Sequence, residues 1–375
     1  MQIPRIYEKL EDFFEPGKAL VIFGPRQVGK TTLIKNFLNR TKEKWRYETG
    51  DDARLHEILG SMDRSKIKEF VKGYDIVALD EAQRIPNIGM ALKLIVDDIP
   101  NIKIIATGSS SFELAGQVGE PLTGRKRTLS LFPISQLELR KFTNDIDLED
   151  QLSSRLIFGS YPEIITADSN DKKREKVEEI AHSYLLKDIL EFDRVKSSKI
   201  LLDLLRLLAF QIGNEVSLSE IATKLGIDTK TVARYLDLFE KAFVLLNVRG
   251  FSGNLREEIT KKSKYYFYDN GVRNALIANF NDLPLRNDIG ALWENFVFME
   301  RFKKRSYTKK SANVYFWRTW QQQEVDIVEE RDGNLFGYEV KYSSKKISAP
   351  LQWKENYPES KFRLVTKENY LDFVA

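Results

Sequence analysis

The sequence predicts an α/β protein whose first part is a parallel sheet wound by helices. Short apolar strands alternate there with helical segments, which is typical of such a sheet. Two further observations agree: a glycine-rich string follows the first strand directly, and a pair of acidic residues ends the third strand. The expected strands are Ala19–Phe23, Lys44–Glu48, Ile76–Asp80, Ile102–Thr107 and Thr128–Leu131.

The glycine-rich string reads GPRQVGKT and matches the phosphate-binding pattern G-x-x-x-x-G-K-[ST]. In that loop backbone N–H groups surround phosphate oxygens, the lysine reaches the β- and γ-phosphates, and the threonine hydroxyl ligates Mg²⁺. Strand, loop and helix come in the required order, because a helix is expected from Thr31 to Leu38. We therefore expect ATP and Mg²⁺ to bind at Gly24, Pro25, Arg26, Gln27, Val28, Gly29, Lys30, Thr31 and Thr32.

The acidic pair at the end of strand Ile76–Asp80 completes this prediction. We expect Asp80 to hold Mg²⁺ through water opposite Thr31, and Glu81 to polarise the attacking water as a general base. A polar residue after the next strand lies beside the γ-phosphate in many such sheets, so Ser109 is a sensor candidate. The same serine could instead only cap the following helix.

Hydrolysis usually needs a cation on the charge that develops at the γ-phosphate. The cluster Arg125, Lys126 and Arg127 follows the sensor strand and could supply it, either in cis or from a neighbouring subunit. Arg26 inside the loop and Arg84 after the acidic pair are rivals, and Arg125 is our choice.

The middle of the chain is predicted to be helical. From Ser135 to about Val195 we expect helices, with the charged run 170–176 as an exposed loop that opens a helix. The next block predicts a helix-turn-helix followed by a wing. Its expected parts are a helix at Leu201–Ile212, a capping box at Ser217, a turn at Gly226, a helix at Thr229–Lys241 and a strand at Phe243–Val248.

The second helix of that pair carries candidate DNA contacts. Lys230 and Arg234 lie four residues apart on one side, with Thr231 nearby, and such residues reach phosphates or base edges in a major groove. Winged helices also serve as protein–protein joints, and a charge run is usually a solvated face. Both interpretations remain open.

The last block carries an acidic set with meaningful spacing. We expect Glu294 on a helix at Ile289–Arg305, Asp326 in a strand, and Glu339 and Lys341 on one face of the following strand. Three carboxylates can hold Mg²⁺ or Mn²⁺ through oxygen ligands, and a lysine can orient water for attack on a phosphodiester. The expected strands are Tyr265–Tyr268, Val314–Trp317, Glu324–Val328 and Leu335–Lys341, with a turn at Arg331–Asn334.

The strings GPRQVGKTT, LDEAQRI, ATGSSS and GRKRTLSLFPISQLEL resemble a prokaryotic family of AAA-like P-loop ATPases. Members carry a C-terminal domain of unknown function related to PD-(D/E)xK nucleases. The acidic set is similar to that nuclease core, with Asp326 and Glu339-Val340-Lys341 as its motif, Glu294 as the helical acid and Val325 in place of proline. Such folds are also kept as binding platforms after catalysis is lost.

The resemblance covers essentially the whole chain and implies four regions. These are a P-loop ATPase core at 1–134, a helical lid at 135–197, a winged helix at 198–262 and a nuclease-like α/β domain at 263–375.

Composition excludes several classes of site. The 375 residues include no cysteine and two histidines, which excludes disulfides, thiol catalysis, zinc–thiolate sites and histidine metal cages. No apolar stretch approaches the ~18 residues that cross a bilayer, and the start of the chain lacks the apolar core of a signal peptide. We expect a cytoplasmic protein without a membrane partner. The net charge of +4 is too small to indicate nucleic-acid binding by itself.

Three hypotheses of function follow. The favoured one is a Mg²⁺-dependent ATPase that acts on DNA, in which ATP binding repositions the winged helix and the nuclease-like domain. The second is an ATP-gated switch or scaffold whose winged helix binds protein partners and whose C-terminal domain is inert. The third is a ring-forming DNA motor, a homo-oligomer in which Arg125 acts in trans.

Overall fold

The computed structural model describes residues 3–108, 122–184, 198–252, 263–343 and 346–375. The chain divides into two compact units. The first unit holds the chain up to Phe132 together with Lys241–Phe243, and the second holds Pro133–Glu240 and Val244–Ala375. Helices and strands alternate in both, so the predicted α/β class is confirmed.

The first unit contains a five-stranded sheet in the order β2-β3-β4-β1-β5, and every pairing is parallel, as predicted. Two of its strands have the predicted bounds and the others shift by one or two residues. The strands are β1 (Ala19–Phe23), β2 (Trp45–Thr49), β3 (Ile76–Asp80), β4 (Lys103–Gly108) and β5 (Lys126–Ser130).

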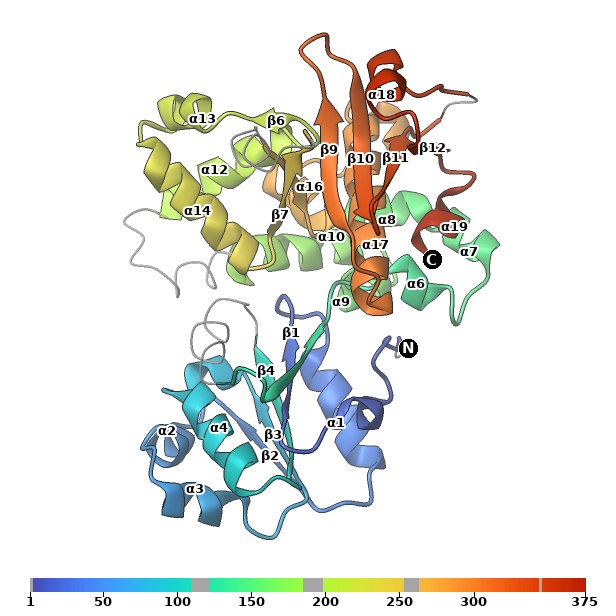
Figure 1. The fold of residues 1–375 in the computed structure, drawn as a ribbon. Helices are drawn as coiled ribbons and strands as arrows, with labels where there is room; N and C mark the ends of the chain where they lie inside the picture. Colours follow the sequence, from blue (N-terminus) through green and yellow to red (C-terminus); the bar gives the residue numbers. More distant parts are fainter. Residues whose placement is uncertain (1–2, 109–121, 185–197, 253–262, 344–345) are drawn as a thin grey trace. The chain divides into compact units, whose positions relative to one another are not determined.

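Helices cover both faces of this sheet (Figure 1). Val21, Val77 and Ile104 point from β1, β3 and β4 into one core, which α2, α3 and α4 close, and α1 lies on the other face. Burial on both faces explains why these strands are continuous apolar runs rather than alternating ones. The helical segments are η1 (Leu10–Phe13), α1 (Lys30–Arg40), α2 (Ala53–Leu59), α3 (Arg64–Val71), η2 (Ala82–Arg84) and α4 (Ile88–Asp98).

The second unit begins with the expected helical stretch. Its segments are α6 (Gln136–Leu139), α7 (Asp145–Asp150), α8 (Leu152–Phe158), α9 (Pro162–Ile165), α10 (Asn170–Glu179) and η3 (Ile180–Tyr184). The loop predicted at 170–176 is wrong, because these residues are helical from Asn170 onward. The Ser169 hydroxyl caps the helix by accepting from Lys172 N, and an Arg174–Glu178 pair supports the next turn.

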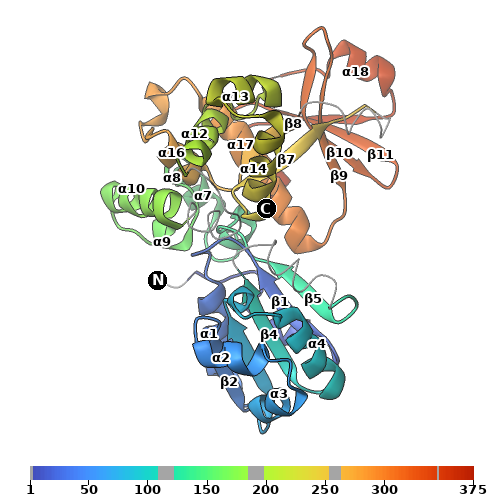
Figure 2. The ribbon, with the colours of Figure 1, turned by 90° about the vertical axis from the view of Figure 1, so that its left-hand side faces the viewer.

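The predicted helix-turn-helix is present. Ser217 caps its first helix, and Gly226 ends that helix in the left-handed conformation with φ +65°. The antiparallel pair β7–β8 follows as the wing (Figure 2). The elements are α12 (Ser198–Phe210), β6 (Glu215–Val216), α13 (Leu218–Leu225), α14 (Thr229–Lys241), β7 (Leu245–Gly250) and β8 (Ser263–Phe267).

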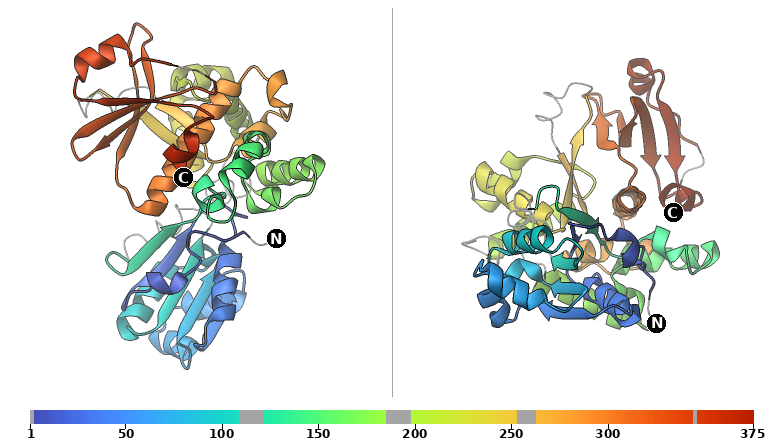
Figure 3. Two further views of the ribbon diagram at one scale, coloured as in Figure 1. Left: turned by 90° about the vertical axis from the view of Figure 1, so that its right-hand side faces the viewer. Right: turned by 60° about the horizontal axis from the view of Figure 1, so that its bottom comes forward.

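The wing strands and the C-terminal strands form one mixed sheet of seven strands in the order β12-β11-β10-β9-β7-β8-β6. The sheet therefore runs across the boundary expected at 262/263. Helix α17 lies beside the C-terminal helix α19 (Figure 3). Arg301 on α17 donates to the Phe373 carbonyl. The remaining elements are α16 (Asn270–Leu276), η4 (Leu283–Leu285), α17 (Ile289–Thr308), β9 (Asn313–Arg318), β10 (Glu324–Arg331), β11 (Asn334–Val340), α18 (Leu351–Asn356), β12 (Lys361–Val365) and α19 (Tyr370–Val374).

Among the described residues, no helix combines the length and the apolar character that a membrane span requires.

Candidate functional site

The loop between β1 and α1 has the conformation that its sequence predicts. Gly24, Gln27 and Gly29 all have positive φ, at 153°, 61° and 94°. A Cβ at Gly24 would overlap the Leu131 carbonyl, so only glycine fits there. Gln27 accepts a left-handed conformation that is costly for a residue with a side chain, and such strain clusters at ligand-binding loops.

Lys30, the first residue of α1, is buried at 4% exposure. Its ammonium donates to the carbonyls of Gly24 at 2.7 Å and Pro25 at 2.8 Å, so it lies against the loop itself. Both acceptors are uncharged, which suits an ammonium that has to bind phosphate. Of the other residues predicted to bind ATP, Val28 is buried and Thr32 is exposed.

Asp80 at the end of β3 is buried and accepts three hydrogen bonds from hydroxyl groups. Its Oδ2 accepts from Thr31 Oγ1 at 2.6 Å and from the Tyr47 hydroxyl at 2.8 Å, and its Oδ1 accepts from Thr107 Oγ1. No lysine or arginine in the described ranges forms an ion pair with it. Burial and the Asp80 carboxylate together raise the pKa of Tyr47, which therefore stays a donor. The structure thus brings Thr31 and Asp80 together as expected.

Glu81 follows with a left-handed backbone, φ 49°. Its N–H donates to Thr107 Oγ1 at 3.0 Å, and its carboxylate accepts from Gln83 Nε2 at 2.5 Å. Thr107 therefore connects both acidic residues. Ser109, the sensor candidate, lies outside the described residues.

Sequence reasoning missed Tyr47, Gln83 and Thr107. A usable signal existed for Thr107, a polar residue that follows the apolar run Ile104-Ile105-Ala106 next to the expected site. Tyr47 gave none, because its contact with Asp80 depends on β2 pairing with β3 in the register Thr49↔Asp80.

Arg125 is misplaced for action in cis, and that part of the prediction is wrong. It precedes β5, whose first residue pairs with Ala19 at the start of β1, whereas the phosphate-binding loop follows the last residue of β1. A strand of that length separates them by roughly 16 Å. Arg125 instead pairs with Asp97, and the rival Arg84 with Asp51.

A different arginine supports the loop. The Arg5 guanidinium donates to the Val28 carbonyl and, at 2.7 Å, to the Phe132 carbonyl. It ties the N-terminal segment to the outside of the loop.

These residues fit a nucleoside triphosphate with Mg²⁺. The loop at Gly24 admits no side chain, the Lys30 ammonium lies on it, and Asp80 brings a carboxylate that three neutral hydroxyls bind. That combination offers a positive group to phosphate and a negative group to a cation.

The second unit contains another charged cluster, which includes the predicted acidic set. The Lys341 ammonium lies 2.7 Å from Glu339 Oε1 and 3.6 Å from Asp326 Oδ2. Asp326 also accepts from Val340 N at 2.8 Å. Burial, and to a lesser degree the neighbouring Asp326, raises the pKa of Glu294 on α17. The structure therefore brings all four predicted residues together.

A residue that the sequence did not single out sits among them. Lys264 on β8 is 1% exposed, and its ammonium lies 3.2 Å from Glu294 Oε1 and 2.5 Å from Glu324 Oε1. The Tyr266 hydroxyl also donates to Glu294, at 2.7 Å. Burial raises the pKa of Glu294 to about 7, and burial likewise raises the pKa values of Asp326 and Glu339.

The Mg²⁺ or Mn²⁺ site predicted at Glu294, Asp326 and Glu339 is not supported. Within the described ranges, no three His, Cys, Asp or Glu side chains are placed to hold a metal ion. The physical reason is that Lys264 and Lys341 pair with these carboxylates and occupy part of the space between them. The sequence could not show this, because Lys264 comes from a strand 30 residues before Glu294.

The candidate DNA contacts lie on α14. Lys230 and Arg234 are exposed, as a contact role requires. Thr231 is half-buried, and both its N–H and its hydroxyl bind Asp228, at 2.8 Å and 2.7 Å. Asp228 therefore caps the helix by accepting from Thr231, and the two cations are the accessible groups.

Comparison with protein families gives three matches along the chain. Residues 16–140 match the AAA domain model. Residues 149–283 match a domain of unknown function (DUF8612), and residues 289–373 match another domain of unknown function (DUF4143). Together with the parallel sheet and the loop geometry, the first match shows that the N-terminal part is a P-loop ATPase domain of the AAA type. The match at 289–373 does not show a relation to nucleases.

Curated relatives are similar over most of the chain. An uncharacterized protein of Mycobacterium tuberculosis is 27% identical over 333 residues, covering 87% of this chain and 70% of its own. One of Methanocaldococcus jannaschii is 27% identical over 332 residues, covering 84% and 72%. One of Haemophilus influenzae is 25% identical over 380 residues, covering 93% and 90%.

Among solved structures, a Walker-type ATPase of Pyrococcus abyssi has a TM-score of 0.48 at 19% identity, covering 72% of this chain and 94% of its own. The Thermotoga maritima RuvB Holliday junction branch migration motor has a TM-score of 0.30 at 16% identity, covering 64% and 85%. Both scores lie below 0.5, so neither likeness supports an inference about this chain.

Proposed function

We propose that the protein is a cytoplasmic, Mg²⁺-dependent ATPase that acts on DNA. The observation that carries the ATPase part is the arrangement around Asp80. A carboxylate at a strand end is held by three neutral hydroxyls, one of them from Thr31, and the phosphate-binding loop with its buried Lys30 lies at the same edge of the sheet.

Each residue has a role that its contacts support. Lys30 binds the β- and γ-phosphates, and the backbone of the loop from Gly24 to Gly29 surrounds them. Thr31 and Asp80 would hold Mg²⁺, which neutralises charge on the phosphates when it is bound. Glu81 is the general base that takes a proton from the attacking water, and Gln83 orients its carboxylate.

Two substitutions test these roles separately. Lys30→Ala should abolish ATP binding, because it removes the main positive charge on the phosphates. Glu81→Gln should keep ATP bound while turnover falls by a factor of about 10²–10⁴, since only activation of water is lost. The measurements are ATP titration and phosphate release, and equal turnover in wild type and Glu81→Gln would remove Glu81 from the mechanism.

Action on DNA is supported by the exposed cations Lys230 and Arg234 on the second helix of the helix-turn-helix. If they contact phosphates, replacing both with alanine should weaken DNA binding and flatten its salt dependence. Lys224→Ala on α13 is the matched control, because that lysine is exposed and already paired with Glu220. An unchanged salt slope would favour the alternative of a switch or scaffold that binds protein partners.

Two measurements separate the remaining hypotheses. Stimulation of ATP turnover by DNA supports action on DNA over the switch. A change of mass in solution upon nucleotide binding supports a ring-forming motor, the one case in which Arg125 acts in trans on a neighbouring subunit.

For the C-terminal part we propose a role in binding rather than cleavage. The support is that the Lys341 ammonium already pairs with both Asp326 and Glu339. Plasmid nicking in Mg²⁺ or Mn²⁺ tests this directly. Cleavage that Asp326→Ala and Lys341→Ala both remove would restore the nuclease hypothesis.

A further inference from the structure

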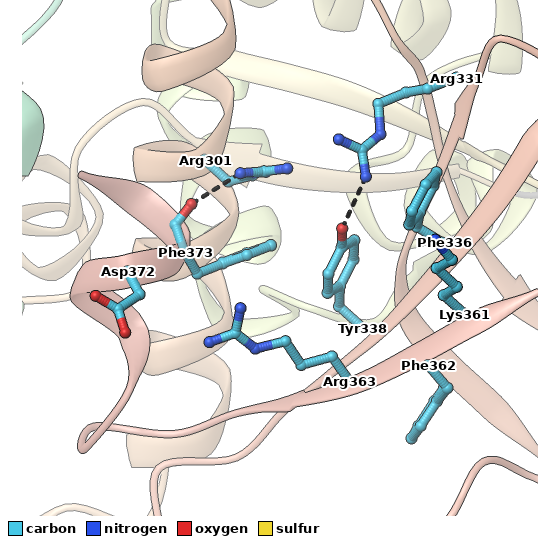
Figure 4. A pocket seen from close by; sticks show the side chains of 9 residues that line it. All are labelled: Arg301, Arg331, Phe336, Tyr338, Lys361, Phe362, Arg363, Asp372 and Phe373. Atoms are coloured by element: carbon cyan, nitrogen blue, oxygen red, sulfur yellow. Dashed lines mark hydrogen bonds between the residues drawn. The ribbon is translucent and has the colours of Figure 1, made fainter.

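Two adjoining hollows lie where β10, β11 and β12 meet helices α17 and α19. They share Arg301 and Arg331, and have volumes of about 270 Å³ and about 120 Å³. Figure 4 shows the side chains that line the larger one, which come from all five elements. We call the two hollows together the basic groove. None of its lining residues belongs to the helix-turn-helix or to the acidic set around Asp326.

The basic groove carries a surplus of positive side chains. Arg301, Arg331, Lys361 and Arg363 line the larger hollow, and Lys304, Arg305 and Lys310 are added in the smaller one. The acidic side chain in its lining is Asp372. Beneath it, the fully buried Glu329 is shared by three guanidiniums, those of Arg301, Arg305 and Arg331. One carboxylate cannot neutralise three cations, so the groove stays strongly positive.

The outer cations are available for a ligand. Lys361 and Arg363 are exposed and form no ion pair with any carboxylate in the described part of the chain, and Lys310 likewise forms none there. Burial, together with the nearby cations Arg301, Lys310 and Arg140, lowers the pKa of Lys304 to about 8. A bound anion would relieve that repulsion.

Aromatic rings hold the inner guanidiniums in place. Arg331 stacks over Phe336 with its guanidinium carbon 3.8 Å from the ring centre, and Arg301 lies 4.4 Å over Phe373. Arg331 also donates to the Tyr338 hydroxyl at 3.1 Å. Stacking fixes the plane of a guanidinium, which lowers the entropy cost of presenting its N–H groups to a phosphate.

We propose that the basic groove binds the phosphodiester backbone of a nucleic-acid strand. Its outer cations lie in two hollows, Lys361 and Arg363 in the larger and Lys310 in the smaller, so they match a series of phosphates better than a single anion. The inference rests on the proposed action on DNA, and it assigns the contact to a surface outside the winged helix.

The test is fluorescence anisotropy with labelled DNA of about 20 nucleotides, single-stranded in one arm and duplex in the other. The variant is Lys361→Ala/Arg363→Ala, whose exposed side chains leave no partner unpaired. We expect affinity to fall about tenfold, with a salt slope flatter by about 1.4 on single strands or about 1.8 on duplex. The arm with the larger loss identifies the form of DNA. Lys354→Ala, an exposed lysine on α18 outside the groove, should bind as the wild type does.

Several outcomes would overturn the proposal. Wild-type protein that binds neither form of DNA would do so, as would a double variant with unchanged affinity and salt slope. A labelled poly-glutamate peptide that binds the wild type more tightly than DNA, and the double variant weakly, would assign the groove to an acidic protein segment. ATP turnover without DNA should be the same in the variant and the wild type. If neither protein turns over ATP, the ATPase proposal is contradicted, whereas the result for DNA binding at the basic groove still stands.

Discussion

Two clusters of carboxylates in this protein differ in what surrounds them. At the phosphate-binding loop, Asp80 is bound by the hydroxyls of Thr31, Tyr47 and Thr107. In the second unit, Asp326 and its neighbours are bound by the ammonium groups of Lys341 and Lys264. Hydroxyls orient a carboxylate without offsetting its charge, whereas ammonium groups offset part of it.

The difference shows why similar acidic patterns in a sequence lead to different chemistry. A carboxylate held by neutral donors still attracts a cation, which is what a Mg²⁺ site needs. A carboxylate paired with a lysine has already gained part of that stabilisation within the chain. The deciding groups come from other strands: β2 and β4 in the first case, and β8 in the second.

The largest effect that we expect is the loss of stability when Lys264 is replaced. Lys264→Met should destabilise the second unit by about 3–5 kcal/mol, because Glu294, whose side chain is 13% exposed, and the half-buried Glu324 would lose their shared cation. Urea denaturation followed by tryptophan fluorescence measures it, since Trp293, Trp317 and Trp353 are buried in this unit.

The matched control for this substitution is Lys341→Ala, whose side chain is 43% exposed and should cost far less. Adding Glu294→Gln to Lys264→Met should recover part of the loss, because it removes one uncompensated charge. A loss below about 1 kcal/mol would mean that the lysine does not hold the charge balance.

The second prediction compares the two carboxylate clusters by their binding of metal. In the presence of ATP, calorimetric titration with Mn²⁺ should show binding that Asp80→Asn weakens by about 10–100-fold. Asp326→Asn should leave that binding unchanged, because the carboxylate it neutralises already has Lys341 as its partner. A second Mn²⁺-binding step that is absent from Asp326→Asn would show that a cation displaces the lysines. Both clusters would then bind metal.

Local patterns in the sequence predicted the elements of both clusters. The strands Ala19–Phe23 and Ile76–Asp80 have the expected bounds, because both are apolar runs ended by a clear change of composition. The hairpin at Arg331–Asn334 is also present, with Asp332 and Gly333 at positive φ as its turn requires.

What the sequence could not predict depends on pairing between distant strands. The contact of Tyr47 with Asp80 needs the β2–β3 register, and that of Lys264 with Glu294 needs β8 to lie beside α17. The sequence could not place Arg125 relative to the phosphate-binding loop for the same reason. Only the β1–β5 register shows which end of the sheet it occupies. The side chains that decide charge balance are therefore less predictable than the elements that carry them.

A smaller effect is expected at Thr107, which joins the two acidic residues of the nucleotide site. Thr107→Val keeps the shape but removes the hydroxyl that donates to Asp80 and accepts from Glu81 N. We expect a loss of about 1–3 kcal/mol in stability, since a buried N–H would lose its acceptor, and about tenfold slower ATP turnover. Thr107→Ser keeps the hydroxyl and should restore turnover. If it does not, the methyl group matters rather than the hydrogen bonds.

The smallest effect is expected at Tyr47. Tyr47→Phe removes one of the two hydroxyls that bind Asp80 Oδ2, and Thr31 still donates to the same oxygen. Because Tyr47 is half-buried and the remaining hydrogen bonds hold the Asp80 carboxylate, we expect about 0.5–1.5 kcal/mol lower stability and turnover within severalfold of the wild type. Tyr74→Phe, at an exposed position in the same unit, is the control. Metal affinity should not fall, because losing a neutral donor leaves the charge of Asp80 in place. A fall as large as that of Asp80→Asn would mean that the hydroxyl acts on the cation or the reaction itself, and that neutral donors are more than supports for the carboxylate.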